Sequence, residues 1–380
     1  MKILHVCLAS AFTEGMNYQE NFLSDQNITD GHDVTVISDC YKYEKGKMVK
    51  TNAEDKVLPN GIRLIRLEYD RVINALITGK VRKVSALFDT IVEISPDIIL
   101  YHGMIGWEML SVAKYKMNNP KVKLYIDSHE DFNNSARNFI SKYLQYKIFN
   151  RAIVKKILPV IDKVFYVSFE SRTFLKELYN VPSDLMEFFP LGGLIIHPLE
   201  RSEIRENVRK ELGITEEHIV FVHSGKMSME KRTKDLLTAF LKVKDKKFRL
   251  ILIGAFPENT SEEIFPLIKS DDRIKFLGWK NGNELLNYLC AADMYLQPGS
   301  QSATMQNAIC CGCPVMLYPY KSHELYLKNN GYFVKTLDDI VNVFLSIEND
   351  PEILKEMSKA SYGVAYDLLD YRKLASRLYG

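Results

Sequence analysis

The chain has 380 residues, of which 46% are hydrophobic and 26% charged, with a formal net charge of only +2. The length predicts two domains, and the composition is that of a soluble globular protein. The small net charge excludes a global nucleic-acid-binding signature, and no apolar run reaches the ~18 residues that a membrane-spanning helix needs. The six cysteines show no disulfide framework, so we expect a reducing, cytoplasmic location.

The chain begins with a predicted strand, helix and second strand. Lys2–Leu8 is an apolar run, Tyr18–Ile28 has helical spacing, and Asp33–Ser38 is again apolar. This order predicts a doubly wound parallel sheet. The first loop contains Gly15 but no GxGxxG fingerprint, so a dinucleotide site is not indicated. Gly15 and Glu20 are either ligand contacts or a simple turn and a solvated glutamate.

A histidine follows one of the next predicted strands. In an open α/β sheet, ligands bind at the carboxyl ends of the strands. His129 therefore either donates to a sugar hydroxyl or phosphate, oriented by Glu130 or Asp131, or helps to cap a loop. His102 has a similar place at a strand end. The strands themselves are predicted at Ile62–Leu67, Ile98–Tyr101, Lys123–Asp127 and Lys163–Val167.

Two windows are basic and lack acidic residues. Six basic residues lie between Arg137 and Ile161, interleaved with aromatic and aliphatic ones, and a second window runs from Arg71 to Phe88. Amphipathic basic helices bind anionic membrane surfaces. The alternative is a solvated face above a buried apolar stripe. The aromatic residues are spaced as a helix core would space them, which argues against nucleic acid.

A break in the pattern from Leu191 to Pro198 predicts the interdomain linker. A new apolar strand, Ile219–Ser224, is followed by Gly225, Lys226 and Lys231 before the next helix. Closely spaced cations between a strand end and a helix predict a phosphate site, because lysines neutralise phosphates as point charges. A plain basic loop is the alternative.

The stretch from Asp293 to Leu317 predicts a strand, a turn of small residues, a short helix and a strand. Pro298 and Gly299 end the first strand. The turn is either an ordinary connection or an anion cradle at a helix N-terminus. Gly278 closes a neighbouring strand, which places it at the same predicted edge. The turn residues expected at the ligand are Ser300, Gln301, Ser302 and Ala303.

Together these motifs resemble the GT-B glycosyltransferases, in particular the retaining family 4 (glycosyl transferases group 1). That family typically shows a glycine and a basic residue followed five residues on by lysine, and later a proline, a Gly/Ser loop and a helix ending Cys-Gly-x-Pro-Val. The N-terminal half shows a glycine in the first loop and a later histidine. The matching positions are Gly15, Gly31–Val34, His129, Phe189–Gly192, Gly225, Lys226, Lys231, Pro298, Cys311, Gly312, Pro314 and Val315.

The resemblance implies two doubly wound, Rossmann-like α/β domains that face a cleft. We expect an acceptor-side domain at residues 1–192 and a nucleotide-sugar donor domain at 198–362. A C-terminal helix, 363–380, is expected to pack back on the first domain. One departure concerns two glutamates that the family usually carries eight residues apart, because those positions are Gly299 and Asn307 here. Asn307 can still hydrogen-bond a ribose hydroxyl through its amide.

The implied reaction is transfer, with retention, of a hexosyl or N-acetylhexosaminyl group from a nucleotide sugar, a UDP-sugar being favoured. The acceptor is a glycan or lipid-linked hydroxyl in the assembly of cell-surface polysaccharide or glycolipid, at the inner face of the membrane. No Asp-x-Asp occurs in the sequence, so we expect no metal and no cofactor. Catalytic roles fall to His129, Lys226 and Lys231. Donor contacts fall to Gly15, Gly225, Gly278, Gly299, Ser300, Gln301, Ser302, Ala303 and Asn307.

Two other functions fit the same architecture. A nucleotide-sugar epimerase, or a phosphorylase, would use acid and base groups such as Glu130 and Asp131. A non-catalytic subunit that only binds a nucleotide sugar would fit the missing glutamates.

Overall fold

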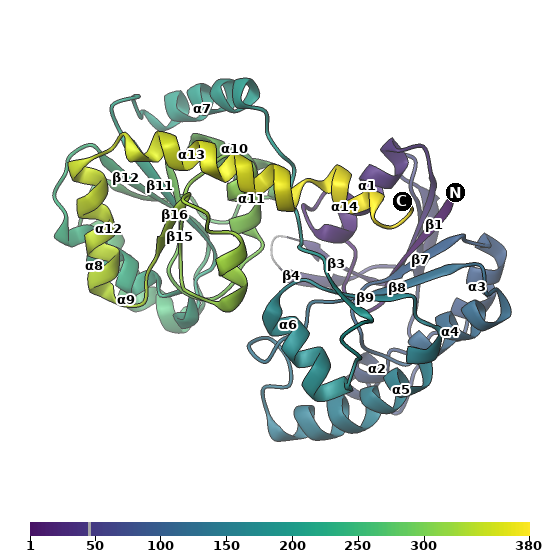
Figure 1. Cartoon of the computed structure of the whole chain (residues 1–380). Helices are drawn as coiled ribbons and strands as arrows, with labels where there is room; N and C mark the ends of the chain where they lie inside the picture. The colour runs from purple at the N-terminus through teal and green to yellow at the C-terminus, as the bar shows by residue number, and fades with distance from the viewer. Residues whose placement is uncertain (45–46) are drawn as a thin grey trace. The chain divides into compact units, whose positions relative to one another are not determined.

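The computed structural model describes residues 1–44 and 47–380, which form two compact α/β units (Figure 1). Unit 1 comprises Met1–Pro190 and Tyr371–Gly380, and unit 2 comprises Leu191–Asp370. Each unit contains a largely or wholly parallel sheet with helices on its faces. The predicted fold class, two doubly wound Rossmann-like domains, is confirmed. The chain changes unit after residues 190 and 370, whereas the sequence placed these boundaries at 192–198 and 362.

The sheet of unit 1 has the strand order β10-β9-β8-β7-β1-β2-β6-β5 among the described residues, and only β5 runs antiparallel to its neighbour. The short strands β3 and β4 pair separately and antiparallel. The strands are β1 (Lys2–Cys7), β2 (Asp33–Asp39), β3 (Tyr41–Glu44), β4 (Lys47–Lys50), β5 (Glu54–Val57), β6 (Arg63–Leu67), β7 (Ile98–Tyr101), β8 (Lys123–Ser128), β9 (Lys163–Tyr166) and β10 (Met186–Phe188).

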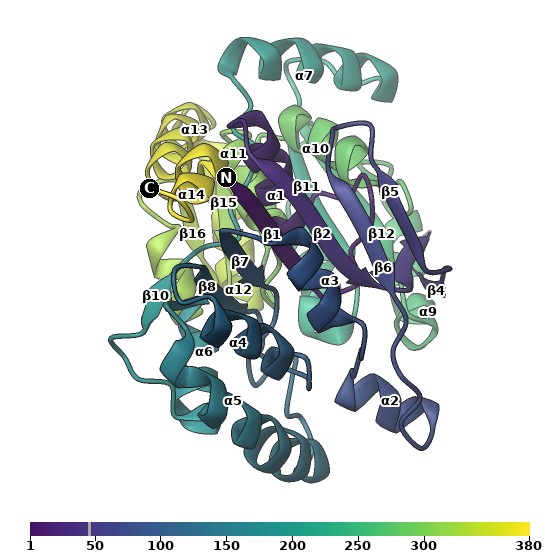
Figure 2. The same cartoon turned by 90° about the vertical axis from the view of Figure 1, so that its right-hand side faces the viewer.

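Helices cover both faces of this sheet, so its central strands are buried along most of their length, and β7 is apolar throughout. Figures 1 and 2 show α1 and α14 on the face opposite α3 and α4. The helices are α1 (Gln19–Thr29), α2 (Ala75–Val81), α3 (Leu87–Ile94), α4 (Met109–Asn118), a π-helical segment (Ser141–Asn150), α5 (Arg151–Ile157), a 3₁₀ turn (Leu158–Val160), α6 (Phe169–Phe174), a π-helical segment (Leu175–Tyr179) and α14 (Tyr371–Ser376).

The sheet of unit 2 is parallel throughout, in the order β13-β12-β11-β14-β15-β16. Its strands are β11 (Ile219–Lys226), β12 (Phe248–Ala255), β13 (Ile274–Phe276), β14 (Met294–Gln297), β15 (Val315–Leu317) and β16 (Gly331–Phe333). Its helices are α7 (Pro198–Leu212), α8 (Thr233–Lys242), α9 (Glu258–Lys269), α10 (Gly282–Ala291), α11 (Thr304–Cys310), α12 (Leu337–Asn349) and α13 (Ile353–Val364), with 3₁₀ turns at Met229–Lys231 and Lys321–Leu325 and a π-helical segment at Ala365–Leu369.

The prediction of one continuous C-terminal helix is wrong. The π-helical segment of unit 2 ends at Leu369, and Asp370 is extended, with φ −64° and ψ 111°. The backbone there pairs with Gly193, whose N–H donates to the Leu369 carbonyl at 3.0 Å. Only α14 then enters unit 1, where Tyr371 and Leu374 pack into an apolar cluster with residues of α1 and the sheet.

A buried arginine holds the loops at the carboxyl edge of unit 1. Arg66 on β6 is 1% exposed and donates to the carbonyls of Phe12, Asp39 and Tyr41 at 3.0–3.1 Å. Its Nε also donates to the Glu54 carboxylate at 3.0 Å. These bonds tie together the loops that follow β1 and β2, two of the strands whose ends form the ligand edge of the sheet.

We expect Arg66→Met to destabilise unit 1 by at least ~3 kcal/mol, because it removes the guanidinium donor from three carbonyls, two of them in buried hydrogen bonds, and each unsatisfied group costs about 1–3 kcal/mol. The measurement is urea unfolding followed by Trp107 fluorescence in a Trp279→Phe background. Arg63→Met on the same strand is the control, since Arg63 pairs with Asp55 near the surface and such pairs contribute at most about 1 kcal/mol. Equal losses from the two variants would contradict this role of Arg66.

Candidate active site

The predicted phosphate-binding residues of unit 2 lie together at the carboxyl end of β11. Lys226 is exposed there, whereas Lys231 is 6% exposed in the turn that follows. The Lys231 ammonium is buried and has no hydrogen-bond partner among the described residues. A Cβ at Gly225 would lie 3.3 Å from Lys231 Cε and 3.5 Å from its Nζ. Glycine at 225 therefore lets the lysine lie against the strand end.

The turn after β14 meets the same lysine. A Cβ at Gly299 would lie 2.1 Å from the Glu230 carbonyl oxygen and 2.7 Å from that of Lys231. The next N–H, from Ser300, donates to the Glu230 carbonyl at 2.8 Å. The structure thus brings Gly225, Lys231 and Gly299 together. The other predicted turn residues follow Ser300, with Gln301 and Ser302 partly buried and Ala303 exposed.

Burial has a direct electrostatic effect on the lysine. Desolvation lowers the pKa of Lys231 to about 8, because a buried ammonium loses its hydration. Among the described residues, no ion pair with Lys231 offsets this loss of hydration. A bound anion would favour the charged form and raise the pKa again.

Two other predicted donor contacts lie on the same unit. Gly278 follows β13, and its carbonyl accepts from the Gly254 N–H at 2.8 Å. Gly254 is in register with Gly225, so Gly278 belongs to the same edge. Asn307 lies on α11, and its Oδ1 is 3.0 Å from the position that a Cβ on Gly193 would take. The Asn307 amide therefore faces Gly193, which lies in the predicted linker at the beginning of unit 2.

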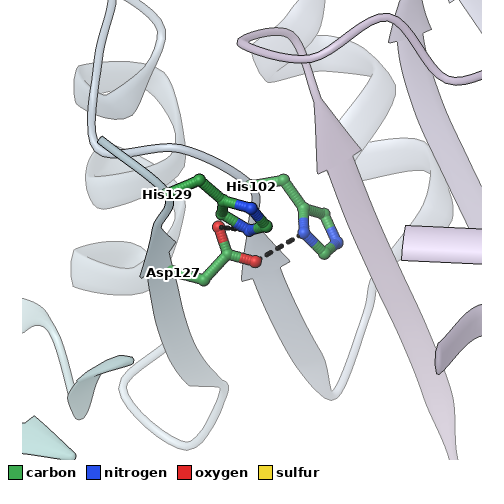
Figure 3. A group of neighbouring side chains, drawn as sticks. All are labelled: His102, Asp127 and His129. Atoms are coloured by element: carbon green, nitrogen blue, oxygen red, sulfur yellow. Dashed lines mark hydrogen bonds and ion pairs between the residues drawn. The ribbon is translucent and has the colours of Figure 1, made fainter. Parts of the chain in front are cut away.

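In unit 1, the buried Asp127 carboxylate contacts two histidines at the ends of neighbouring strands, His102 and His129 (Figure 3). Asp127 on β8 accepts a hydrogen bond from His102 Nδ1 at 2.6 Å and from the Gly103 N–H at 2.8 Å. His129 Nε2 lies 3.4 Å from the other Asp127 oxygen. Asp127 is 1% exposed, whereas the His129 side chain is 38% exposed. The His129 ring thus lies at the ligand edge of the sheet, and the buried Asp127 carboxylate contacts the ring on its protein side.

The prediction that Glu130 or Asp131 orients His129 is wrong. Glu130 accepts from the Ser128 hydroxyl at 2.8 Å, and Asp131 accepts from the N–H groups of Asn133 and Asn134. The reason is the period of the strand, since side chains two residues apart point to the same side. Asp127 and His129 are such a pair.

The Asp127–His129 pair determines the charge of the histidine. Burial raises the pKa of Asp127, but His102 and His129 hold it well below its usual range. Burial lowers the pKa of His129, but the Asp127 carboxylate outweighs this and raises it to about 9. Glu20, which is buried on α1, adds to the attraction. His129 is therefore a cation at neutral pH.

A chain of buried polar groups continues behind Asp127. His102 Nε2 lies 3.0 Å from His5 Nδ1, and His5 Nε2 lies 2.9 Å from the Asn27 amide. Burial lowers the pKa of His5 to about 3, so His5 stays neutral. Among the described residues, His102, Asp127 and His129 offer atoms within 4.8 Å of one another that could ligate a metal. The Asp127 oxygens already accept hydrogen bonds, so a metal would have to displace them.

Gly15 lies apart from this chain. It is exposed in the loop after β1, with φ +71°, and nothing lies within 4 Å of the position of a Cβ. Sequence reasoning missed the roles of Asp127 and His5. The two-residue spacing between Asp127, near the end of β8, and His129, which directly follows β8, was the signal that could have revealed the role of Asp127.

Comparison with known proteins finds a family match within unit 2 and two curated relatives. Residues 204–364 match the family described as "Glycosyl transferases group 1". The chain is 25% identical over 296 residues to the alpha-monoglucosyldiacylglycerol synthase of Acholeplasma laidlawii, which covers 73% of this chain and 71% of that one. It is 32% identical over 181 residues to the N-acetyl-alpha-D-glucosaminyl L-malate synthase of Bacillus anthracis, but this match spans only 45% and 46% of the two chains.

A solved structure extends the likeness to the whole fold. The crystal structure of Anabaena Alr3699/HepE in complex with UDP has a TM-score of 0.72 with this chain, at 17% identity, and the match covers 99% of this chain and 98% of the other. None of the helices described here has the length and apolar character needed to cross a membrane.

We expect Asp127→Asn to lower the pKa of His129 from about 9 to at or below the ordinary ~6.5, because desolvation then acts without the carboxylate. The raised pKa stabilises the folded protein at low pH, and that stability is lost as pH rises through about 9. The measurement is NMR titration of protein labelled with ¹⁵N-histidine. Glu130→Gln is the matched control and should change the pKa of His129 far less. An unchanged titration in Asp127→Asn would contradict the assignment.

Proposed function

Because the chain belongs to the glycosyl transferases group 1 family and folds as a GT-B glycosyltransferase, we propose that it transfers a hexosyl or N-acetylhexosaminyl group from a UDP-sugar to a lipid-linked or glycan hydroxyl. We assign the donor diphosphate to Gly225, Lys226, Lys231 and the turn that begins at Gly299. Gly278 and Asn307 are assigned to the nucleoside. The resemblance to this family supports a reaction with retention at the anomeric carbon.

The observation that carries the proposal is the buried, unpartnered ammonium of Lys231. A buried charge without a partner is unfavourable, so its partner is expected to be a ligand. A diphosphate at Gly225 would supply that partner, and exposed Lys226 would bind its outer oxygens. Negative charge develops on the leaving diphosphate during transfer, and fixed cations stabilise it most in that state.

We propose that these lysines replace a metal ion. The sequence has no Asp-x-Asp pair to chelate one beside the diphosphate. His129 is protonated at neutral pH, so it can donate to a hydroxyl or an anionic oxygen of the bound substrates. The expected activity is accordingly insensitive to EDTA.

The test is incubation of the full chain with UDP-, GDP- and dTDP-sugars and a panel of lipid and glycan acceptors, followed by NMR of the products. We expect a UDP-sugar to give a new glycoside with the anomeric configuration of the donor. A changed sugar stereocentre on an intact nucleotide would identify an epimerase instead. Donor binding without transfer or hydrolysis would identify a binding subunit.

Lys231→Ala provides the matched test of the donor site. We expect it to reduce kcat/KM at least ~10-fold, because a charge-assisted bond contributes about 1.5–3 kcal/mol. In the wild type, the affinity for UDP should fall as pH rises through about 8, where free Lys231 loses its proton. Lys231→Arg stays charged and should lack this dependence. Lys234→Ala is the control, since Lys234 is exposed and pairs with Glu263.

We further propose that unit 1 docks on an anionic membrane surface. Five large apolar side chains between residues 139 and 148 are 39–74% exposed, although a separate set further along the segment is buried. Monomers rarely expose such a cluster without a partner. We name this cluster, with its interleaved Lys142 and Lys147, the basic apolar surface. Its apolar members are Phe139, Ile140, Tyr143, Leu144 and Ile148. The name of the Acholeplasma relative, a diacylglycerol glycolipid synthase, supports a lipid acceptor.

We expect changing Lys142, Lys147 and Lys155 to Glu to weaken binding to anionic vesicles by at least ~100-fold, because each lysine near the surface contributes about 1 kcal/mol. Flotation with phosphatidylglycerol vesicles at two salt concentrations measures this. The control changes Lys244, Lys246 and Lys269, which are exposed on unit 2. Flotation that is the same in both triple variants would refute the proposed surface.

A further inference from the structure

Unit 1 contains a pocket of about 500 Å³ that none of the assignments above uses. It lies at the carboxyl ends of β1, β2 and β6, and part of α2 closes one side. Figure 2 shows α2 beyond the end of β6. Ligands of open α/β sheets bind at this edge. The pocket thus lies where ligands of such a sheet bind, on the unit that carries His129.

The cations of this pocket outnumber the acids that can neutralise them. Lys50 pairs with Glu68 at 3.2 Å, and the Asp39 carboxylate accepts a hydrogen bond from Tyr69 at 2.8 Å. Two arginines, Arg71 and Arg82, also line the pocket, and neither forms an ion pair among the described residues, although Asp39 attracts Arg82 electrostatically without a direct contact. The site therefore favours an anion.

Arg82 is held in place from several sides. Its backbone is left-handed, with φ +53°, and its N–H donates to the Thr78 carbonyl at 2.8 Å. Its Nε donates to the Gly79 carbonyl at 3.2 Å, and its stem lies 3.4 Å from the position of a Cβ on Gly106. Its Nη1 is buried without a hydrogen-bond partner among the described residues. A strained backbone and an unsatisfied guanidinium nitrogen in one residue indicate a functional position.

The pocket has neighbours of the candidate catalytic histidine on one side and a helix that contacts the proposed membrane surface on the other. Ala9 lines the pocket, and a Cβ on Gly103 would lie 2.6 Å from Ala9 Cβ and 3.6 Å from Glu130 Oε1, next to His129. On the other side, Lys80 of α2 donates to Gln145 at 2.6 Å, within the π-helical segment of the basic apolar surface.

We propose that this pocket binds a phosphate group of the acceptor, with Arg82 as its main ligand and Arg71 at the mouth. The assignment rests on the proposed function, since it names the chemistry of the acceptor. Two separate guanidinium groups suit a tetrahedral phosphate, because each donates two parallel hydrogen bonds to a pair of its oxygens. A lipid chain on the basic apolar surface would leave the head group beside His129. Arg82 and Arg71 are positioning residues, because they hold the acceptor away from the reacting atoms.

The test measures binding of inorganic phosphate, glycerol 3-phosphate and vesicles to the whole 380-residue chain. The vesicles contain either phosphatidic acid or, as a charge-matched lipid without phosphate, oleate. We expect Arg82→Gln to weaken phosphate binding at least ~10-fold and Arg82→Lys to weaken it less, since lysine keeps the charge and loses the fork. Lys83→Gln is the control, because Lys83 is exposed beside Asp70 and does not line the pocket.

The two sources of phosphate give different results. Arg82-dependent binding of all the phosphate probes means that the group alone is recognised, and binding of phosphatidic acid only means that it must be lipid-borne. Both support the proposal. Equal binding by wild type and Arg82→Gln would overturn it, as would equal binding of phosphatidic acid and oleate vesicles.

A second readout does not depend on any variant folding. In the wild type, either inorganic phosphate or phosphatidic acid vesicles should protect Arg82 from phenylglyoxal, detected by mass spectrometry. Oleate vesicles should not protect Arg82, and inorganic phosphate should not protect exposed Arg137. Absence of protection by both phosphate-bearing probes overturns the proposal. UDP binding, measured in parallel, separates the two hypotheses. If UDP binds but Arg82 is not protected, only the hypothesis of an acceptor phosphate pocket is refuted. If Arg82 is protected but no nucleotide binds, the proposed sugar transfer is refuted.

Discussion

The close approach of two backbone segments in unit 2 determines where its buried cation lies. The turn after β14 passes so near the Glu230–Lys231 peptide that no side chain fits at Gly299. The hydrogen bond from Ser300 to the Glu230 carbonyl fastens this contact, and the absence of a Cβ at Gly225 leaves room for the lysine. Lys231 is thereby held against the strand edge with its charge unsatisfied, which prepares the unit for an anion before one binds.

Unit 1 obtains a fixed cation by the opposite arrangement. Its buried charge is the Asp127 carboxylate, which is satisfied by the Gly103 N–H and two histidines. The half-exposed member, His129, carries the compensating proton to the surface. The buried Asp127 carboxylate thus keeps the half-exposed His129 imidazole charged. The buried Lys231 ammonium of unit 2, in contrast, has no counter-charge among the described residues until an anion binds. Both devices place positive charge at the carboxyl edge of a parallel sheet.

The sequence was a good guide wherever one strand or turn determines the structure by itself. The two strands predicted on either side of the turn are observed as Met294–Gln297 and Val315–Leu317, because one apolar run ends at Pro298 and Gly299 and the next begins after Pro314. The β3–β4 pair was missed, since half of its residues are charged and none is fully buried, and since Arg66 holds the Tyr41 carbonyl of β3 from β6. Likewise, the Asp127–His102–His5 chain joins three strands, so it depends on sheet register, which local patterns do not contain. The burial of Lys231 depends on packing in the same way.

The structure also explains why position 299 is glycine and not the glutamate that the resemblance leads one to expect. A carboxylate cannot be restored by substitution there, because its Cβ would lie 2.1 Å from the Glu230 carbonyl oxygen. The turn therefore offers neutral groups to a donor, and one of them, the Gln301 amide nitrogen, is buried without a hydrogen-bond partner among the described residues. A carboxylate only accepts hydrogen bonds, whereas an amide nitrogen donates them. Under the proposed function, sugar recognition at this turn shifts from accepting protons of hydroxyl groups to donating to sugar oxygens or to an acetamido carbonyl. A glutamate near Lys231 would also compete with the donor diphosphate for the lysine ammonium. With glycine at position 299, the ammonium stays available to the diphosphate.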